Sequence, residues 1–138
     1  MNSQKIIDSN FKAGLLKILD VNIFKKALIF TSPGNDKRGN TDLLKKELKK
    51  QNIKIETFLI NNYPTIQSIN QALKITNDFD PDLIVSIGGG STIDTAKVVS
   101  VCNVSKINLT DINNLKLSEK IFHISIPTTA GSGAESTK

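Results

Sequence analysis

A run of three glycines stands where an apolar segment gives way to a helical pattern. The stretch Ser86–Lys97 reads Ser-Ile-Gly-Gly-Gly-Ser-Thr-Ile-Asp-Thr-Ala-Lys, and the apolar residues 83–85 lead into it. Glycine permits positive φ and lets a ligand approach the backbone closely. A helix that begins at or near Ser91, with Asp94 in the place that Glu takes in a capping box, would point its free N–H groups at such a ligand. The stretch therefore predicts an anion site, most naturally for a phosphate.

A second loop bears on whether the first one binds a ligand. Taken alone, Gly-Gly-Gly-Ser fits a turn without a ligand equally well, because it is neither Gly-x-Gly-x-x-Gly nor a P-loop. Residues 126–135, Ile-Pro-Thr-Thr-Ala-Gly-Ser-Gly-Ala-Glu, are the end of an apolar run followed by a loop rich in hydroxyl groups and glycine. Ligands of open α/β sheets bind outside the carboxyl ends of the strands. Two such loops at one edge favour a ligand site.

Strands and helices are expected to alternate, so that both loops follow strands of one sheet. Apolar or alternating runs predict strands over 27–31, 53–59, 83–87 and 121–126, with a short edge strand at 6–7. Helices are predicted over about 10–20, from 40 or 41, from 66 and from 91 to 101, with loops at 32–35 and 103–120. This order predicts an α/β fold with a largely parallel sheet and helices on both faces. Thr65 is expected to cap a helix with Ile66, Ile69, Leu73 and Thr76 on its inner face.

Together the two loops resemble motifs of the iron-containing (type III) alcohol dehydrogenase family. Residues 88–97 match the family's Gly-Gly-Gly-Ser-x-x-Asp-x-Ala-Lys, and residues 127–135 match Pro-Thr-Thr-Ala-Gly-Thr-Gly-Ser-Glu. Ser132 replaces a usual Thr and keeps the hydroxyl group, whereas Ala134 replaces a usual Ser and loses it. The resemblance implies that residues 1–138 are a Rossmann-like dinucleotide-binding domain. The helical, metal-binding C-terminal domain of the family is absent from this sequence.

The resemblance implies NADP or NAD as the cofactor and suggests how the glycine loop binds it. Gly89, Gly90 and Ser91 would bind the pyrophosphate through backbone N–H groups. Asp94 would lie near the nicotinamide, although capping of the helix accounts for this residue equally well. Lys97 is three residues beyond Asp94 and is expected to pair with it along the helix.

The second loop is expected to contact the same cofactor. The resemblance favours contact of Thr128 and Thr129 with the nucleotide over a simple role in ending the strand. It also implies that the hydroxyl group of Ser132 lies near the ribose or the nicotinamide. His123 is the sole histidine, and its place within a strand favours a packed or edge residue over a metal ligand.

The residues after the first core strand bear on the choice between NADP and NAD. NAD users of the family carry an Asp just after this strand, and Ser32 takes its place here. A serine brings no negative charge, and Lys37 and Arg38 follow in the same segment, so the sequence predicts a preference for NADP. Asp36 would reverse this preference if it faced the ribose. A plain turn with solvated charges is the alternative.

No catalytic residue and no metal ligand is assigned, because the family holds its iron or zinc with side chains of the C-terminal domain. The intact protein is expected to transfer hydride between the nicotinamide and a small alcohol or aldehyde, and the 138-residue chain alone is expected to be inactive. Two alternatives stay open. The chain is a truncated, non-catalytic nucleotide-binding or interaction module, or it is a relative of glycerol dehydrogenase or dehydroquinate synthase.

Composition narrows the range of partners. The net charge of +5 comes mostly from lysines on expected helix faces, without interleaved aromatic residues, which disfavours nucleic acid. No apolar run approaches the ~20 residues that span a membrane. A single cysteine, Cys102, forms no internal disulfide and fits the reduced cytoplasm. A homodimer is compatible with the sequence but is not determined by it.

Overall fold

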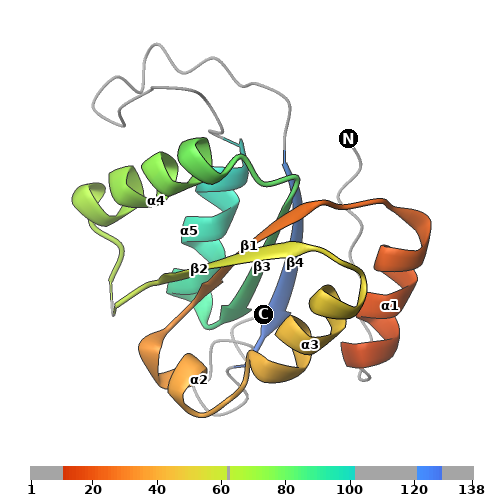
Figure 1. Cartoon of the computed structure of the whole chain (residues 1–138). Helices are drawn as coiled ribbons and strands as arrows, with labels where there is room; N and C mark the ends of the chain where they lie inside the picture. The colour runs from red at the N-terminus through yellow and green to blue at the C-terminus, as the bar shows by residue number, and fades with distance from the viewer. Residues whose placement is uncertain (1–10, 62, 102–120, 129–138) are drawn as a thin grey trace.

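The computed structural model describes residues 11–61, 63–101 and 121–128 of the chain. The expected strand at 6–7 and the expected loop at 103–120 therefore lie outside the described residues. Within them, helices and strands alternate as the sequence predicts (Figure 1). The helices are α1 (Phe11–Val21), α2 (Pro33–Lys37), α3 (Asp42–Lys50), α4 (Ile66–Phe79) and α5 (Gly90–Val101). The strands are β1 (Lys26–Thr31), β2 (Lys54–Leu59), β3 (Leu83–Gly88) and β4 (Phe122–Pro127).

The strands form one parallel sheet in the order β2-β1-β3-β4. The chain adds β2 on one side of β1 and then crosses over to add β3 on the other side. The strand order therefore reverses between β1 and β3, and the carboxyl ends of these two strands flank a topological switch point. This is the place where open α/β sheets bind their ligands.

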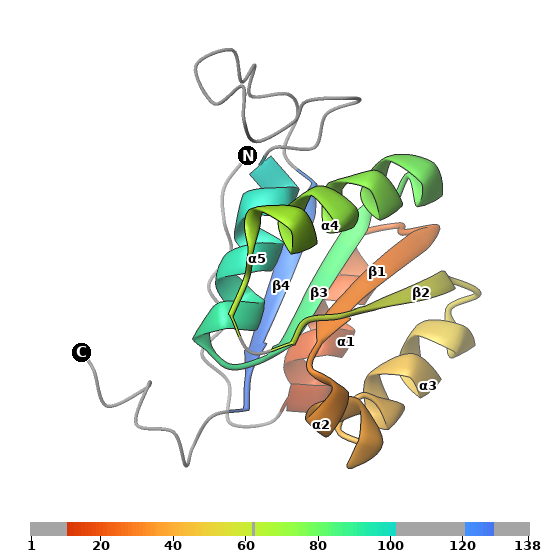
Figure 2. The same ribbon diagram turned by 90° about the vertical axis from the view of Figure 1, so that its left-hand side faces the viewer.

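Each face of the sheet carries its own apolar core, as Figure 2 shows with α1 and α3 on one side and α4 and α5 on the other. Alternate residues of β1 serve the two cores: Ile29 packs with the α1 and α3 side, and Leu28 and Phe30 pack with the α4 and α5 side. The prediction of helices on both faces is confirmed. No helix in the described part of the chain is long and apolar enough to cross a membrane.

The start of α4 confirms one local prediction and corrects another. Thr65 caps the helix, with its Oγ1 accepting a hydrogen bond from the Ser68 N–H while the Ser68 hydroxyl accepts one from the Thr65 N–H. The predicted inward position of Ile66 is wrong, because this side chain is 61% exposed at the first position of the helix. The buried stripe instead includes Ala72, together with the expected Leu73 and Thr76.

The segment after β1 is a short helix, not the loop that was predicted. Ser32 is its N-cap, and the Oγ atom accepts a hydrogen bond from the Asn35 N–H at 3.1 Å. Pro33 follows at the first helical position, where its fixed φ suits the helix and its missing N–H is not needed. The Ser-Pro pair is therefore a helix start here.

Candidate functional site

The glycine loop leaves the first turn of α5 without a side-chain cap. The first helical hydrogen bond runs from the Ile93 N–H to the Gly89 carbonyl at 3.1 Å, so Gly89 occupies the N-cap position. Gly89 has no side chain that could accept from the free N–H groups of that turn. The predicted capping box is therefore wrong, because Ser91 lies inside the helix and not at its cap. The N–H groups of this turn and the positive end of the helix dipole therefore lie at the carboxyl end of β3, which runs directly into the glycine loop.

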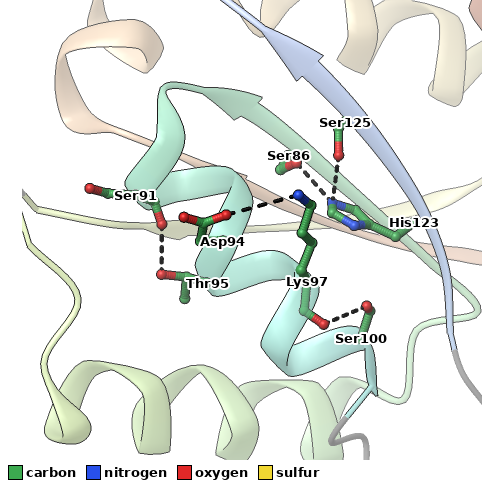
Figure 3. A network of polar contacts seen from close by, with 8 residues as sticks. All are labelled: Ser86, Ser91, Asp94, Thr95, Lys97, Ser100, His123 and Ser125. Atoms are coloured by element: carbon green, nitrogen blue, oxygen red, sulfur yellow. Dashed lines mark hydrogen bonds and ion pairs between the residues drawn. The ribbon is translucent and has the colours of Figure 1, made fainter. Parts of the chain in front are cut away.

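Asp94 makes an ion pair along α5 and is mostly exposed. Its Oδ1 lies 3.9 Å from the Lys97 ammonium group, and both side chains are more than half exposed (Figure 3). The expected pairing of Lys97 with Asp94 is confirmed. The exposed carboxylate of Asp94 lies on the first turns of the helix, close in sequence to the glycine loop.

The absence of a side chain has different structural consequences at positions 88 and 90 of the loop. Gly88 has a φ of +155°, and a Cβ there would lie 2.9 Å from Thr92 Oγ1 and 3.3 Å from Asn35 Nδ2. Of the three consecutive glycines, it is the one with positive φ. At Gly90, a Cβ would meet no described atom within 4 Å beyond its own helix and chain neighbours. The backbone conformation and the close approach of Thr92 and Asn35 therefore require glycine at position 88. At position 90, the missing side chain leaves open space beside the uncapped turn.

The loop after β4 begins directly beside the glycine loop. Gly88 and Pro127 are register partners, and the Thr128 N–H donates to the Gly88 carbonyl at 3.2 Å. The expectation that the two loops start at one edge of the sheet is confirmed. Thr129 and Ser132 lie outside the described residues.

The segment after β1 reaches the same edge through Asn35. This side chain is 6% exposed, and its Nδ2 donates to Thr128 Oγ1 at 3.3 Å. Its Oδ1 accepts from Arg38 Nη2 at 3.0 Å and from Asn40 Nδ2 at 2.8 Å. The sequence pattern predicts a loop at Asn35 and does not indicate a functional role for this residue. The sequence feature that could have identified Asn35 is an amide side chain three residues after the serine that follows a buried strand.

Asp36 in α2 and Arg38 at its C-cap contact different neighbours. Asp36 Oδ1 accepts from the Thr41 hydroxyl at 2.9 Å and from the Lys45 ammonium group at 3.1 Å. The hydrogen bond from Lys45, and then that from Thr41, lower the pKa of Asp36 below its ordinary value. The negative charge of Asp36 is therefore balanced by α3. Arg38, in contrast, is hydrogen-bonded to the neutral Asn35 amide.

His123 lies in a hydrogen-bonded cluster on β3 and β4. Its Nε2 lies 2.8 Å from the Oγ of the buried Ser86 and 3.4 Å from the Oγ of Ser125 (Figure 3). These contacts agree with the predicted packed strand histidine. The described residues contain no group of three or more His, Cys, Asp or Glu side chains that could hold a metal ion.

The fold and the loops at its carboxyl edge define a Rossmann-like α/β domain. The chain belongs to the iron-containing alcohol dehydrogenase family, whose model matches residues 10–138. It is 36% identical over 118 residues to alcohol dehydrogenase 4 of Schizosaccharomyces pombe, covering 83% of this chain and 28% of that protein. It is 31% identical over 119 residues to choline dehydrogenase of Bacillus subtilis, covering 82% of this chain and 30% of that protein.

A solved structure agrees with this assignment. The chain superposes on an iron-containing alcohol dehydrogenase from Thermotoga maritima with a TM-score of 0.73 and 31% identity, covering 89% of this chain and 35% of that one. The resemblance of the two loops to motifs of this family is confirmed. The chain spans only about a third or less of the length of these relatives.

Proposed function

We propose that residues 1–138 form the dinucleotide-binding domain of a metal-dependent alcohol dehydrogenase. The observation that carries this proposal is the meeting of three loops, after β1, β3 and β4, at the switch point of the sheet. The uncapped turn of α5 and the open space at Gly90 fit a phosphate group of such a cofactor.

The chain's own residues would bind and orient the cofactor. The backbone N–H groups of Gly90 and Ser91 would donate to the pyrophosphate, with Gly89 at the cap leaving them free. Thr128 would offer its hydroxyl group from the neighbouring loop, as would Thr129 and Ser132. Asp94 would lie toward the nicotinamide end. The nicotinamide, when bound, supplies the hydride chemistry.

The same site favours NADP over NAD in our proposal. The Ser32 hydroxyl accepts from the Asn35 N–H and can donate its own hydrogen to a phosphate oxygen. The carboxylate of Asp36 is paired with Lys45 on α3, and we infer that it does not face the ribose. Arg38 supplies a guanidinium group in the same segment, and guanidinium groups bind phosphate in a bidentate manner.

The rest of the reaction is assigned to the part of the relatives that this chain does not span. We infer that an iron or zinc ion and the pocket for a small alcohol or aldehyde belong to that part, and that the enzyme works in the cytoplasm. The metal would act there as a Lewis acid on the substrate oxygen.

Calorimetric titration of the purified protein with NADP and with NAD tests the proposal. We expect NADP to bind more tightly, with a dissociation constant in the micromolar range that is usual for such ligands. Binding of neither nucleotide at about millimolar concentration would contradict the proposed function. Dinucleotide binding by a longer form of the protein that has no dehydrogenase activity would favour the non-catalytic module.

A further inference from the structure

We propose that Asn35 is a positioning residue that holds Arg38 for the 2′-phosphate of NADP and so sets the nucleotide preference. This inference rests on the proposed function. It concerns one buried amide whose hydrogen bonds reach the segments after β1 and β4. None of the motifs at the glycine loop or the Thr-Thr loop includes this residue.

The orientation of the Asn35 amide follows from its partners. An arginine side chain can only donate, so the atom that faces Arg38 Nη2 at 3.0 Å must be the carbonyl oxygen. The same oxygen also receives Asn40 Nδ2, which leaves the amide nitrogen to donate to Thr128 Oγ1. The amide is therefore fixed in one orientation by partners on both sides, and Asn35 itself is only 6% exposed, whereas Arg38 and Asn40 are exposed.

Holding Arg38 in place for a phosphate requires a hydrogen-bond acceptor without a negative charge. An amide oxygen holds the guanidinium group in place without cancelling its charge. Arg38 has five N–H donors, so most of them stay available to a phosphate after one is given to Asn35. The neighbouring ion pair between Lys45 and Asp36 differs in this respect, because its acceptor is a carboxylate that balances the positive charge of Lys45.

The position of the guanidinium group supports a role toward a ligand at this edge. Arg38 Nη1 lies 3.2 Å from the point that a Cβ on Gly34 would occupy, so the side chain lies back over the first turn of α2. Ser32 caps that turn. Ser32 and Arg38 are thus the N-cap and C-cap residues of the same short helix, which follows the carboxyl end of β1.

The experiment compares dissociation constants for NADP and NAD in purified wild-type protein and in Asn35→Asp. The substitution keeps the size of the side chain and introduces a carboxylate that pairs with Arg38. We expect NADP binding to weaken at least ~10-fold while NAD binding changes much less. Arg38→Ala should lower the NADP/NAD selectivity to a similar degree, and the double variant should add little to either single change. Lys46→Ala removes one exposed positive charge on α3 and should leave the selectivity unchanged.

Each result supports or overturns the inference. Equal loss of affinity for both nucleotides in Asn35→Asp would show a structural role alone and overturn it, as would an unchanged ratio in Asn35→Asp or Arg38→Ala. If Asn35→Asp shows no cooperative thermal transition, Asn35→Ser gives the comparison, since it lacks the carbonyl that holds Arg38. A wild type that prefers NAD overturns this inference and leaves dinucleotide binding in place. A wild type that binds neither nucleotide overturns the proposed function itself.

Discussion

The Asn35 side chain donates a hydrogen bond to the Thr128 hydroxyl group at 3.3 Å, across 93 positions of sequence. One residue follows β1 and the other follows β4, and these strands are not neighbours in the sheet. The bond passes beside Gly88 at the end of β3, which lies between them in the strand order. Three loops are therefore held together at the place where a ligand of this fold binds.

Two glycine substitutions should separate ligand binding from stability. Gly90→Val adds a side chain to open space, so the thermal midpoint should remain nearly unchanged. The added side chain should fill the phosphate position and weaken dinucleotide binding at least ~10-fold. Gly88→Ala should instead destabilise the fold by about 1–3 kcal/mol, because its Cβ would lie 2.9 Å from Thr92 Oγ1 at a φ of +155°. Calorimetry and thermal unfolding measure both effects. Unchanged cofactor affinity in Gly90→Val would remove the glycine loop from the site.

A carboxylate at position 32 should reverse the cofactor preference. Ser32→Asp keeps an N-cap residue at the start of α2, so the helix should persist. Its negative charge would repel a 2′-phosphate and accept hydrogen bonds from the ribose hydroxyl groups of NAD. We expect the ratio of kcat/KM for NADP over NAD, measured on the intact enzyme, to fall at least ~10-fold. Wild-type preference for NAD, or a ratio that the substitution does not move, would count against Ser32 as the determinant.

The ion pair between Asp36 and Lys45 should contribute to stability in a pH-dependent way. The pKa of Asp36 is lowered in the folded protein from an ordinary value of 3.8. Its contribution is therefore fully present above that value and is lost as the pH falls through the lowered folded pKa. Because the pair is partly exposed, we expect Lys45→Met to change the free energy of unfolding by about 1 kcal/mol or less at neutral pH.

Urea unfolding across the acid range measures this effect. The difference between wild type and Lys45→Met should be constant near neutrality and should shrink as the solution is made strongly acidic. Lys46→Met removes the same charge one residue further along α3 and serves as the control. A difference that grows on acidification would be opposite in sign to the expected linkage.

The 138-residue chain alone should show no alcohol dehydrogenase activity, with or without added iron or zinc. The chain covers 28% of its relative in Schizosaccharomyces pombe, and we assign the metal and the substrate pocket to the remainder. Nicotinamide absorbance in the presence of small alcohols and aldehydes provides the assay. Turnover by the purified chain that disappears in His123→Ala would refute this prediction and make His123 part of a catalytic site.

The sequence by itself determined the alternation of strands and helices, the capping of α4 by Thr65 and the two loops at the carboxyl edge. These features depend on signals within a few residues, such as periodicity, cap residues and runs of glycine. Local signals were insufficient even at short range in three places. The Ser-Pro pair predicts a loop but starts α2, and periodicity places the exposed Ile66 on the buried stripe of its helix. The pattern at Ser91 predicts a capping box, but the N-cap is Gly89.

The tertiary structure alone decided which glycine is constrained, where Asp36 points and that Asn35 contacts Thr128. Gly88 is constrained because Thr92 and Asn35 occupy the space that a Cβ would need, and Asp36 is held by Lys45 on α3. Arg38 and Asn40 lie within five residues of Asn35, but its contact with Thr128 forms only after the sheet has placed β1, β3 and β4 side by side in that order. Burial and hydrogen bonding between distant segments depend on strand order and register, which no short stretch of sequence encodes.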